Sequence, residues 1–142
     1  MPPELFERLT NWFTEHPDLL GQPATDLQIE AAQQALGVVF DAQYVAYIKR
    51  FGASFAGFEI HAFESGPMIG RATVTELTQW FRSSLEDTIP IELRDALVIS
   101  GDGSGNAILI NSRGEIVLHL HEENEIELLS ASLYEMIEGG LP

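Results

Sequence analysis

The stretch LGVVFDAQYVAYI, residues 36–48, contains the end of one helix, a short connection and the start of the next helix. Gly37 suits the C-terminal cap of the first helix, because glycine adopts left-handed backbone without steric cost. Asp41 suits an N-cap, since its carboxylate accepts hydrogen bonds from the first unpaired backbone N–H groups. Gly52 ends the second helix. The apolar face of that helix is expected to consist of Tyr44, Tyr47, Ile48 and Phe51.

Two helices are predicted upstream of this stretch. Thr25, with Gln28 three residues later, has the capping-box pattern and starts a helix that runs to Leu36. The earlier helix follows the opening prolines and ends at His16 before Pro17, because the residue before a proline disfavours helical backbone. Its apolar stripe is predicted to be Leu5, Phe6, Leu9, Trp12 and Phe13.

Downstream of Ser54 the periodicity changes from helical to alternating. Apolar Phe58, Ile60 and Ala62 alternate with the residues between them, which is typical of a half-buried strand, and Gly66 and Pro67 interrupt it. A second capping-box pattern at Thr73 and Glu76 starts a further helix. Its inward side chains are expected to be Val74, Leu77, Trp80, Phe81 and Leu85.

The remainder of the chain predicts an antiparallel meander and a closing helix. Three strand patterns, ALVIS, AILIN and EIVLHLH, are followed by a weaker one in EIELL. The segment SASLYEMIEGG predicts a short helix capped by Ser130 or Ser132 and stopped by Gly139. The order of elements predicts a single α+β domain over residues 1–142, with helices packed around a small antiparallel sheet.

The loop GDGSGN, residues 101–106, joins the first two strands of the meander. A phosphate-binding loop needs a Lys after the glycines and a helix N-terminus, and neither is present. A calcium loop needs Gly and Glu where Ala107 and Arg113 stand. The loop therefore predicts a tight strand connection whose glycines adopt positive φ.

Charge is the most unbalanced property of the chain. The 22 Asp and Glu residues oppose 7 Lys and Arg, which gives a formal net charge of −15. Such a surface repels nucleic acid and anionic membranes, so we expect neither as a partner. Solubility alone is one explanation of the charge, and a strongly basic protein partner is the other. The densest acidic run is Glu122, Glu123, Glu125 and Glu127, which flanks a predicted turn at Asn124.

Cysteine content and the N-terminal sequence exclude further classes. The chain has no Cys, which excludes disulfides, thiolate zinc sites and a Cys nucleophile. Its start lacks the basic and apolar regions of a signal peptide, and no apolar stretch approaches the ~20 residues of a membrane helix. We therefore expect a soluble cytoplasmic protein.

The histidines offer an alternative site. His119 and His121 alternate along a predicted strand, so they are expected on one face, with His61 or Glu123 as a third metal ligand. The simpler interpretation is polar residues on the solvent side of the sheet, and we expect no metal and no cofactor. Ser100 and Ser104 lack the G-x-S-x-G spacing of a nucleophile, so we expect no catalytic residue.

Three motifs in order resemble one family. Residues 36–48 resemble the L-G-x-x-L-P-x-x-Y-x-x-F-L signature of the SUKH superfamily, the Smi/Knr-type domain. Residues 99–106, followed by AILIN, are similar to the gdgsG turn of the family and its succeeding strand. Residues 131–137 resemble its closing a-x-S-F-x-e-f-L helix, with Leu133 in place of Phe. Asp41 stands where the family has Pro, and both residues suit a helix start.

The resemblance implies an α+β fold and a binding function. Bacterial members commonly act as immunity proteins that bind and block a toxin, fungal members regulate cell-wall synthesis and signalling, and no enzymatic activity defines the family. We therefore expect a non-enzymatic immunity protein that occludes the active site of a basic cognate toxin domain, such as a nuclease. A regulatory scaffold and a metal-binding protein or metal-dependent enzyme are the alternatives. The candidate partner contacts are Glu59, His61, His119, His121, Glu122, Glu123, Glu125 and Glu127.

Overall fold

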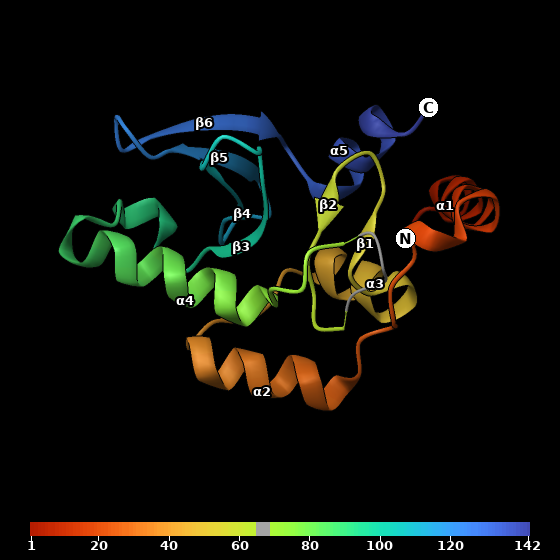
Figure 1. Ribbon diagram of the computed structural model, residues 1–142, viewed down its shortest axis with the longest axis horizontal. Helices are drawn as coiled ribbons and strands as arrows, with labels where there is room; N and C mark the ends of the chain where they lie inside the picture. Colours follow the sequence, from red (N-terminus) through yellow and green to blue (C-terminus); the bar gives the residue numbers. More distant parts are fainter. Residues whose placement is uncertain (65–68) are drawn as a thin grey trace.

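The computed structural model describes residues 1–64 and 69–142, and it confirms the α+β class (Figure 1). The predicted break at Gly66 and Pro67 lies outside the described residues. The elements in chain order are α1 (Pro3–Glu15), η1 (Pro17–Leu19), α2 (Asp26–Leu36), α3 (Ala42–Phe51), β1 (Ser54–Phe55), β2 (Glu59–Ile60), α4 (Val74–Leu85), η2 (Glu86–Thr88), η3 (Ile91–Leu93), β3 (Leu97–Gly101), β4 (Ala107–Ile110), β5 (Ile116–Leu120), β6 (Glu125–Ser130) and α5 (Leu133–Gly140).

Local capping chemistry sets the helix starts as predicted. The Asp41 carboxylate accepts hydrogen bonds from the backbone N–H groups of Gln43 and Tyr44 at 3.0 and 3.1 Å. Thr25 and Thr73 each form a complete capping box. Each box satisfies two backbone donors that the first turn of a helix leaves unpaired.

The predicted start of the last helix is confirmed, and its predicted end is wrong. Ser132, and not Ser130, caps α5, because its hydroxyl accepts the N–H of Glu135 at 3.2 Å. The helix continues through Gly139 to Gly140, so the prediction that Gly139 stops it was wrong. Leu141 is 9 % exposed and its N–H bonds the Ile137 carbonyl, and this burial holds the final turn.

The principal sheet has the strand order β3-β4-β5-β6, and each neighbouring pair is antiparallel. The strand predicted over residues 58–63 is wrong in length, since only Glu59–Ile60 pairs, with Ser54–Phe55. Beyond Ile60 the backbone bonds to other elements instead of to one strand. The His61 N–H donates to the Ile99 carbonyl on β3, and the Val74 N–H of α4 donates to the Ala62 carbonyl.

Both faces of the principal sheet are covered over β3, β4 and β5, whereas β6 is largely exposed. On one face, Ile99, Ile110 and Ile116 belong to the main core with α3 and α5. On the other face, Val98, Leu109 and Val117 form a second core with Leu93 and Ala96, against which Leu77 and Phe81 of α4 pack. The predicted solvent-facing side of the sheet was therefore wrong, because α4 and the segment through η3 cover it.

The N-terminal helix packs at the far end of the molecule from α4 (Figure 1). Its buried side chains are Leu5, Leu9 and Phe13, and the Phe13 ring lies 5.0 Å from that of Phe51 on α3. Phe6 and Trp12 are only partly covered, so the stripe is narrower than predicted. Among the described residues, no helix is long and apolar enough to cross a membrane.

The tyrosines of α3 lie in the main core. Tyr44 and Tyr47 are fully buried, and the Tyr44 hydroxyl donates a hydrogen bond to the His61 carbonyl. The Tyr47 hydroxyl lies 2.7 Å from Ser54 Oγ. Burial raises the pKa of both phenols above the ordinary value, because the charged phenolate is poorly solvated there.

These phenols predict a loss of stability in alkali. A raised folded-state pKa means that the unfolded chain loses the proton first, so stability is complete below pH ~10 and falls above it. Each tyrosine contributes a slope of about 1.4 kcal/mol per pH unit. Urea unfolding between pH 8 and 11 should show that Tyr44→Phe is less stable at pH 8 but has a shallower alkaline slope. Equal slopes in the two proteins would contradict a buried, neutral Tyr44.

Candidate functional site

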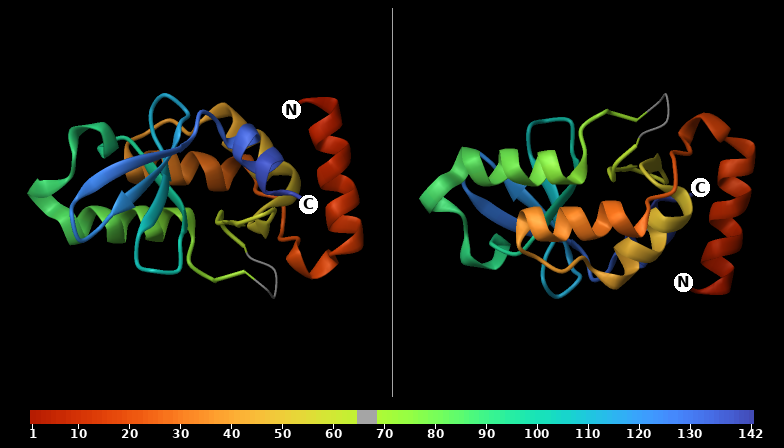
Figure 2. Two further views of the ribbon diagram at one scale, coloured as in Figure 1. Left: turned by 90° about the horizontal axis from the view of Figure 1, so that it is seen from above. Right: turned by 90° about the horizontal axis from the view of Figure 1, so that it is seen from below.

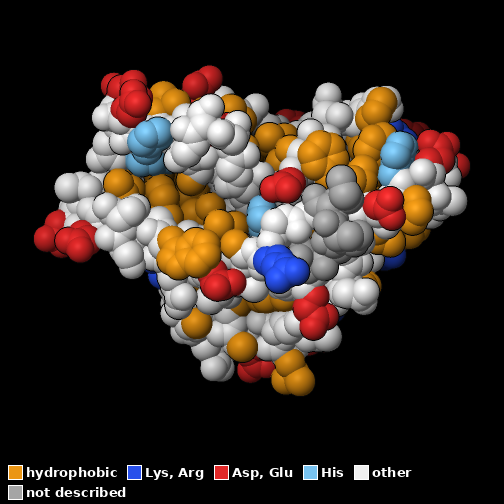
Figure 3. Space-filling model, in the orientation of Figure 1, with side chains coloured by type: hydrophobic (Ala, Val, Ile, Leu, Met, Phe, Trp, Pro, Cys, Tyr) orange, Lys and Arg blue, Asp and Glu red, His pale blue; other side chains and the backbone are white. Residues whose placement is uncertain are grey.

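An open groove of about 380 Å³ lies between α4, β3 and the loop that follows β3. Figure 3 shows a hollow in this region in which hydrophobic side chains gather, with acidic side chains around the outline of the same face. Its apolar part is formed by α4 and the neighbouring strands, and its rim carries polar groups. The lining residues are Glu59, His61, Leu77, Trp80, Phe81, Val98, Ser100, Gly101, Gly103, Gly105, Asn106 and Ala107.

The GDGSGN loop forms one wall of the groove and is held by its own side chains. Asp102 Oδ1 accepts the N–H groups of Ser104 and Asn106 at 2.8 and 3.2 Å, and Oδ2 accepts Asn106 Nδ2 at 2.9 Å. The hydrogen bond from Asn106, followed by that from Ser104, lowers the pKa of the Asp102 carboxyl. All these hydrogen bonds lie within the turn, so the Asp102 carboxylate stabilises the strand connection itself.

Asn106 connects this wall to the β5–β6 turn. Its Oδ1 accepts both the backbone N–H of His121, at 3.0 Å, and the ring Nδ1–H, at 2.6 Å. His121 is exposed, and Glu122 and Glu123 follow it directly. The groove wall and the acidic turn are thus neighbouring parts of one surface.

The other end of the groove carries Glu59 and His61. His61 is only 6 % exposed, so its predicted place on the solvent side of a strand was wrong. Its Nδ1 lies 2.9 Å from the Ala72 carbonyl, which only accepts, so Nδ1 carries a proton. Its Nε2 lies 3.3 Å from the Glu59 carboxylate. The hydrogen bond to the Ala72 carbonyl fixes the imidazole at the rim, beside Glu59.

His119 is also buried, at 2 % exposure, and does not share an open face with His121. Its ring meets the Phe81 ring edge-on at 5.1 Å, and its Nε2 lies 2.7 Å from Asn124 Oδ1. Asn124 in turn donates from Nδ2 to the Thr88 carbonyl at 3.0 Å. The prediction failed because α4 covers this side of the sheet and because β5 ends at Leu120, before His121.

The two histidines therefore do not form one metal site. Within residues 1–64 and 69–142, no group of three His, Asp or Glu side chains is arranged to hold a metal ion. The metal-binding alternative gains no support from these residues.

The acidic residues predicted as partner contacts lie together on the β5–β6 hairpin. Glu122 and Glu123 belong to the turn, and Glu125 and Glu127 to β6. All four are exposed. Glu59 lies apart from them, on β2 at the opposite end of the groove.

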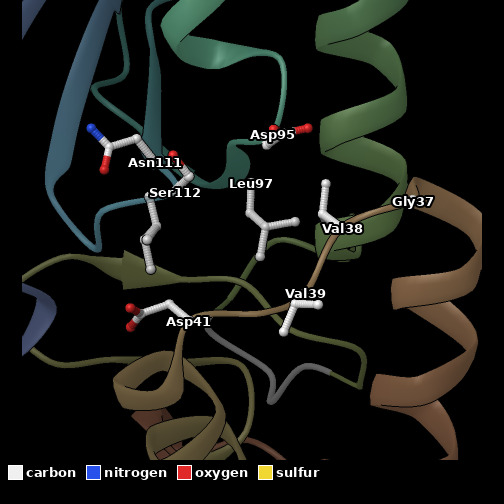
Figure 4. Close-up of a pocket in the computed structure, with 9 residues that line it drawn as sticks. Gly37, Val38, Val39, Asp41, Asp95, Leu97, Asn111 and Ser112 are labelled. Carbon is white, nitrogen blue, oxygen red and sulfur yellow. The ribbon is translucent and has the colours of Figure 1, made fainter.

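A second hollow lies beside the connection between α2 and α3 (Figure 4). Asp41 and Asp95 line it but point away from each other, and Asp41 already caps α3. Asn111 is also occupied, because it accepts the N–H groups of Arg113 and Glu115 at 3.0 Å. These polar groups support the fold, so the α4 groove is the better candidate site.

Trp80 is a second groove residue, after His61, that sequence reasoning misplaced. It was predicted to point into the core, yet it is 57 % exposed and lines the groove. An α-helix turns 100° per residue, so Trp80 lies 100° from Phe81 and outside the buried stripe of α4. Counting 100° per residue along α4 therefore places Trp80 at the side of the buried stripe and not within it.

The chain is an α+β domain, in which helices around an antiparallel sheet frame an open groove with an apolar lining and a polar rim. The chain belongs to the SMI1 / KNR4 family (SUKH-1), whose family model matches residues 23–139. Members of this family act in general as immunity or regulatory proteins and are generally non-catalytic. No curated protein matches the chain.

The groove wall predicts a graded effect of glycine substitutions. Gly103 and Gly105 have φ of 82° and 88°, so alanine at Gly103 should cost about 1–2 kcal/mol of the free energy of unfolding. Gly105→Ala should cost more, because the new Cβ would lie 3.3 Å from His121 Cε1. Gly101 lacks positive φ and has room for a Cβ, so Gly101→Ala is the matched control. Urea unfolding would contradict this if all three variants were equally stable.

Proposed function

We propose that the protein is a cytoplasmic, non-enzymatic immunity protein that binds a cognate bacterial toxin and occludes its active site. The toxin surface would enter the α4 groove while the acidic β5–β6 turn contacts its basic surroundings. The observation that carries the proposal is the exposed Trp80 beside an open groove, on a chain of net charge −15.

The groove has the features of a binding hot spot. Tryptophan supplies a large apolar area with few rotatable bonds, and it is enriched among residues that dominate binding energy. Leu77 and Phe81 continue the apolar surface beside it. A partner arginine placed on the Trp80 ring would gain cation–π attraction and lie on the same groove as the Glu59 carboxylate.

Charge supports a basic toxin, such as a nuclease with a cationic nucleic-acid cleft. Complementary fields accelerate encounter and reject wrong partners. The exposed members of the predicted contact set are suited to direct contact: His121, Glu122, Glu123, Glu125 and Glu127, with the partly exposed Glu59 at the far end of the groove. The buried His119 would act through Asn124, and the buried His61 would support the rim beside Glu59.

Co-expression tests the function directly. The neighbouring gene should encode a large toxin with a divergent C-terminal domain, and co-expression of this chain should restore growth of cells that produce that domain. Failure to protect, together with no measurable complex between the purified proteins, would contradict the immunity function.

Trp80→Ala should weaken the toxin complex at least about 30-fold, which corresponds to the ~2 kcal/mol of a hot spot. Calorimetric titration measures the affinity, and thermal unfolding should change little because Trp80 is largely exposed. The matched control is Val39→Ala, which shortens a side chain that is 89 % exposed on the second hollow. An equal loss in both variants would remove the groove as the binding site.

Reversing the acidic cluster to lysine at Glu122, Glu123, Glu125 and Glu127 should slow association about 10-fold or more at low salt, with a smaller effect at high salt. Stopped-flow measurement of the association rate at several salt concentrations checks this. The control reverses four other exposed glutamates, distant from the β5–β6 turn: Glu4, Glu7, Glu15 and Glu138. The same slowing in the control would attribute the effect to net charge alone.

A further inference from the structure

The strand β6 is an open edge of the principal sheet. It is last in the strand order, and Figure 2 shows it from above with no other element in front of it. In an antiparallel ladder, alternate N–H and C=O groups point away from the neighbouring strand. Within residues 1–64 and 69–142, no hydrogen bond from outside the ladder reaches the backbone of residues 125–129. These outward groups can pair with an added strand.

Apolar side chains accompany this edge. Leu128 is 60 % exposed and Leu129 38 % exposed, which is unusual for leucines on a strand that faces water. Beside them lies another groove, separate from both the α4 groove and the hollow near α3. It measures about 310 Å³, and its lining includes Leu93, Val117, Ile126 and Leu128. An added strand would therefore find both backbone partners and a surface for its apolar side chains, which is the pattern of β-strand addition.

The charged residues of β6 and of the adjacent groove determine which kind of strand can add to this edge. Glu125 and Glu127 are exposed on β6, and Glu92 and Glu115 line the adjacent groove. Arg113 also lines that groove, but its positive charge is already paired, because its Nε lies 2.9 Å from a carboxylate oxygen of Glu115. A second copy of this chain would place its own Glu125 and Glu127 against these carboxylates, and like charges on paired strands are destabilising. The edge favours a basic occupant over self-pairing.

We infer that β6 binds an extended basic segment of the partner protein, which adds to the sheet as a further strand. Its lysines or arginines would lie near Glu125 and Glu127, and its alternate apolar side chains would cover Leu128. The inference rests on the proposed function, because the segment would belong to the bound toxin. It adds a second attachment point, because the β5–β6 turn leads from the groove wall directly into this edge.

A synthetic peptide tests the edge without a toxin. The probe is a nine-residue peptide of alternating lysine and valine, added to the full ¹⁵N-labelled chain. Alternate β6 amides should shift in the NMR spectrum, and their exchange with solvent should slow at least tenfold at saturation. A fully N-methylated peptide keeps the charge but lacks backbone donors, so it should bind at least tenfold more weakly.

Paired variants separate the edge from net charge. Glu125→Lys with Glu127→Lys should weaken peptide binding about tenfold, while Glu4→Lys with Glu7→Lys on α1 should leave it within twofold, provided circular dichroism shows both folded. Four results would each overturn the inference. They are equal binding of the N-methylated peptide, NMR shifts outside β6, no binding at millimolar peptide, and a dimer formed through β6. Loss of toxin protection in Trp80→Ala with no peptide effect on β6 would reject the edge while retaining the immunity function.

Discussion

The hydrogen bond from the buried Tyr44 hydroxyl to the His61 carbonyl joins α3 to the segment on which the candidate site is built. The His61 N–H bonds β3, its ring bonds the Ala72 carbonyl, and the next carbonyl, of Ala62, accepts the Val74 N–H at the start of α4. One short segment thus fixes the sheet, the groove helix and Glu59 relative to the main core. Because these groups are buried, an unpaired one would cost about 1–3 kcal/mol, which favours a single arrangement.

The sequence predicts this fold well where the deciding interactions are local. Asp41 and Thr73 begin helices through contacts within three residues, and the GDGSGN turn needs only its own glycines and Asp102. It fails where a distant element decides. His119 is buried because α4 lies over its side of the sheet. The alternation of apolar and polar residues within β5 contains no information about where α4 packs.

The candidate site, too, could be predicted only where its residues are close together in the sequence. The acidic hairpin residues are adjacent in sequence, so their exposure and proximity were predictable from Glu122 to Glu127. The groove unites Glu59, Trp80 and Asn106, which come from three separate parts of the chain. The GDGSGN loop was predicted as a strand connection alone, and it also forms a wall of the groove. Both roles are compatible, because a turn held by internal hydrogen bonds leaves its outer surface free for contact.

Helices and neighbouring segments cover both faces of β3, β4 and β5, and this cover limits where binding specificity can change. Because both faces are covered over β3 to β5, the parts of the sheet that a partner can reach are its turns, the groove wall and β6. Residues such as Glu122 and Glu123 make no contribution to either core, so they can be exchanged with little effect on the free energy of unfolding. Under the proposed function, the residues that maintain the fold are therefore separate from those that would choose the partner. On that proposal, a new specificity would arise by substitutions in the β5–β6 hairpin while the interior stays unchanged.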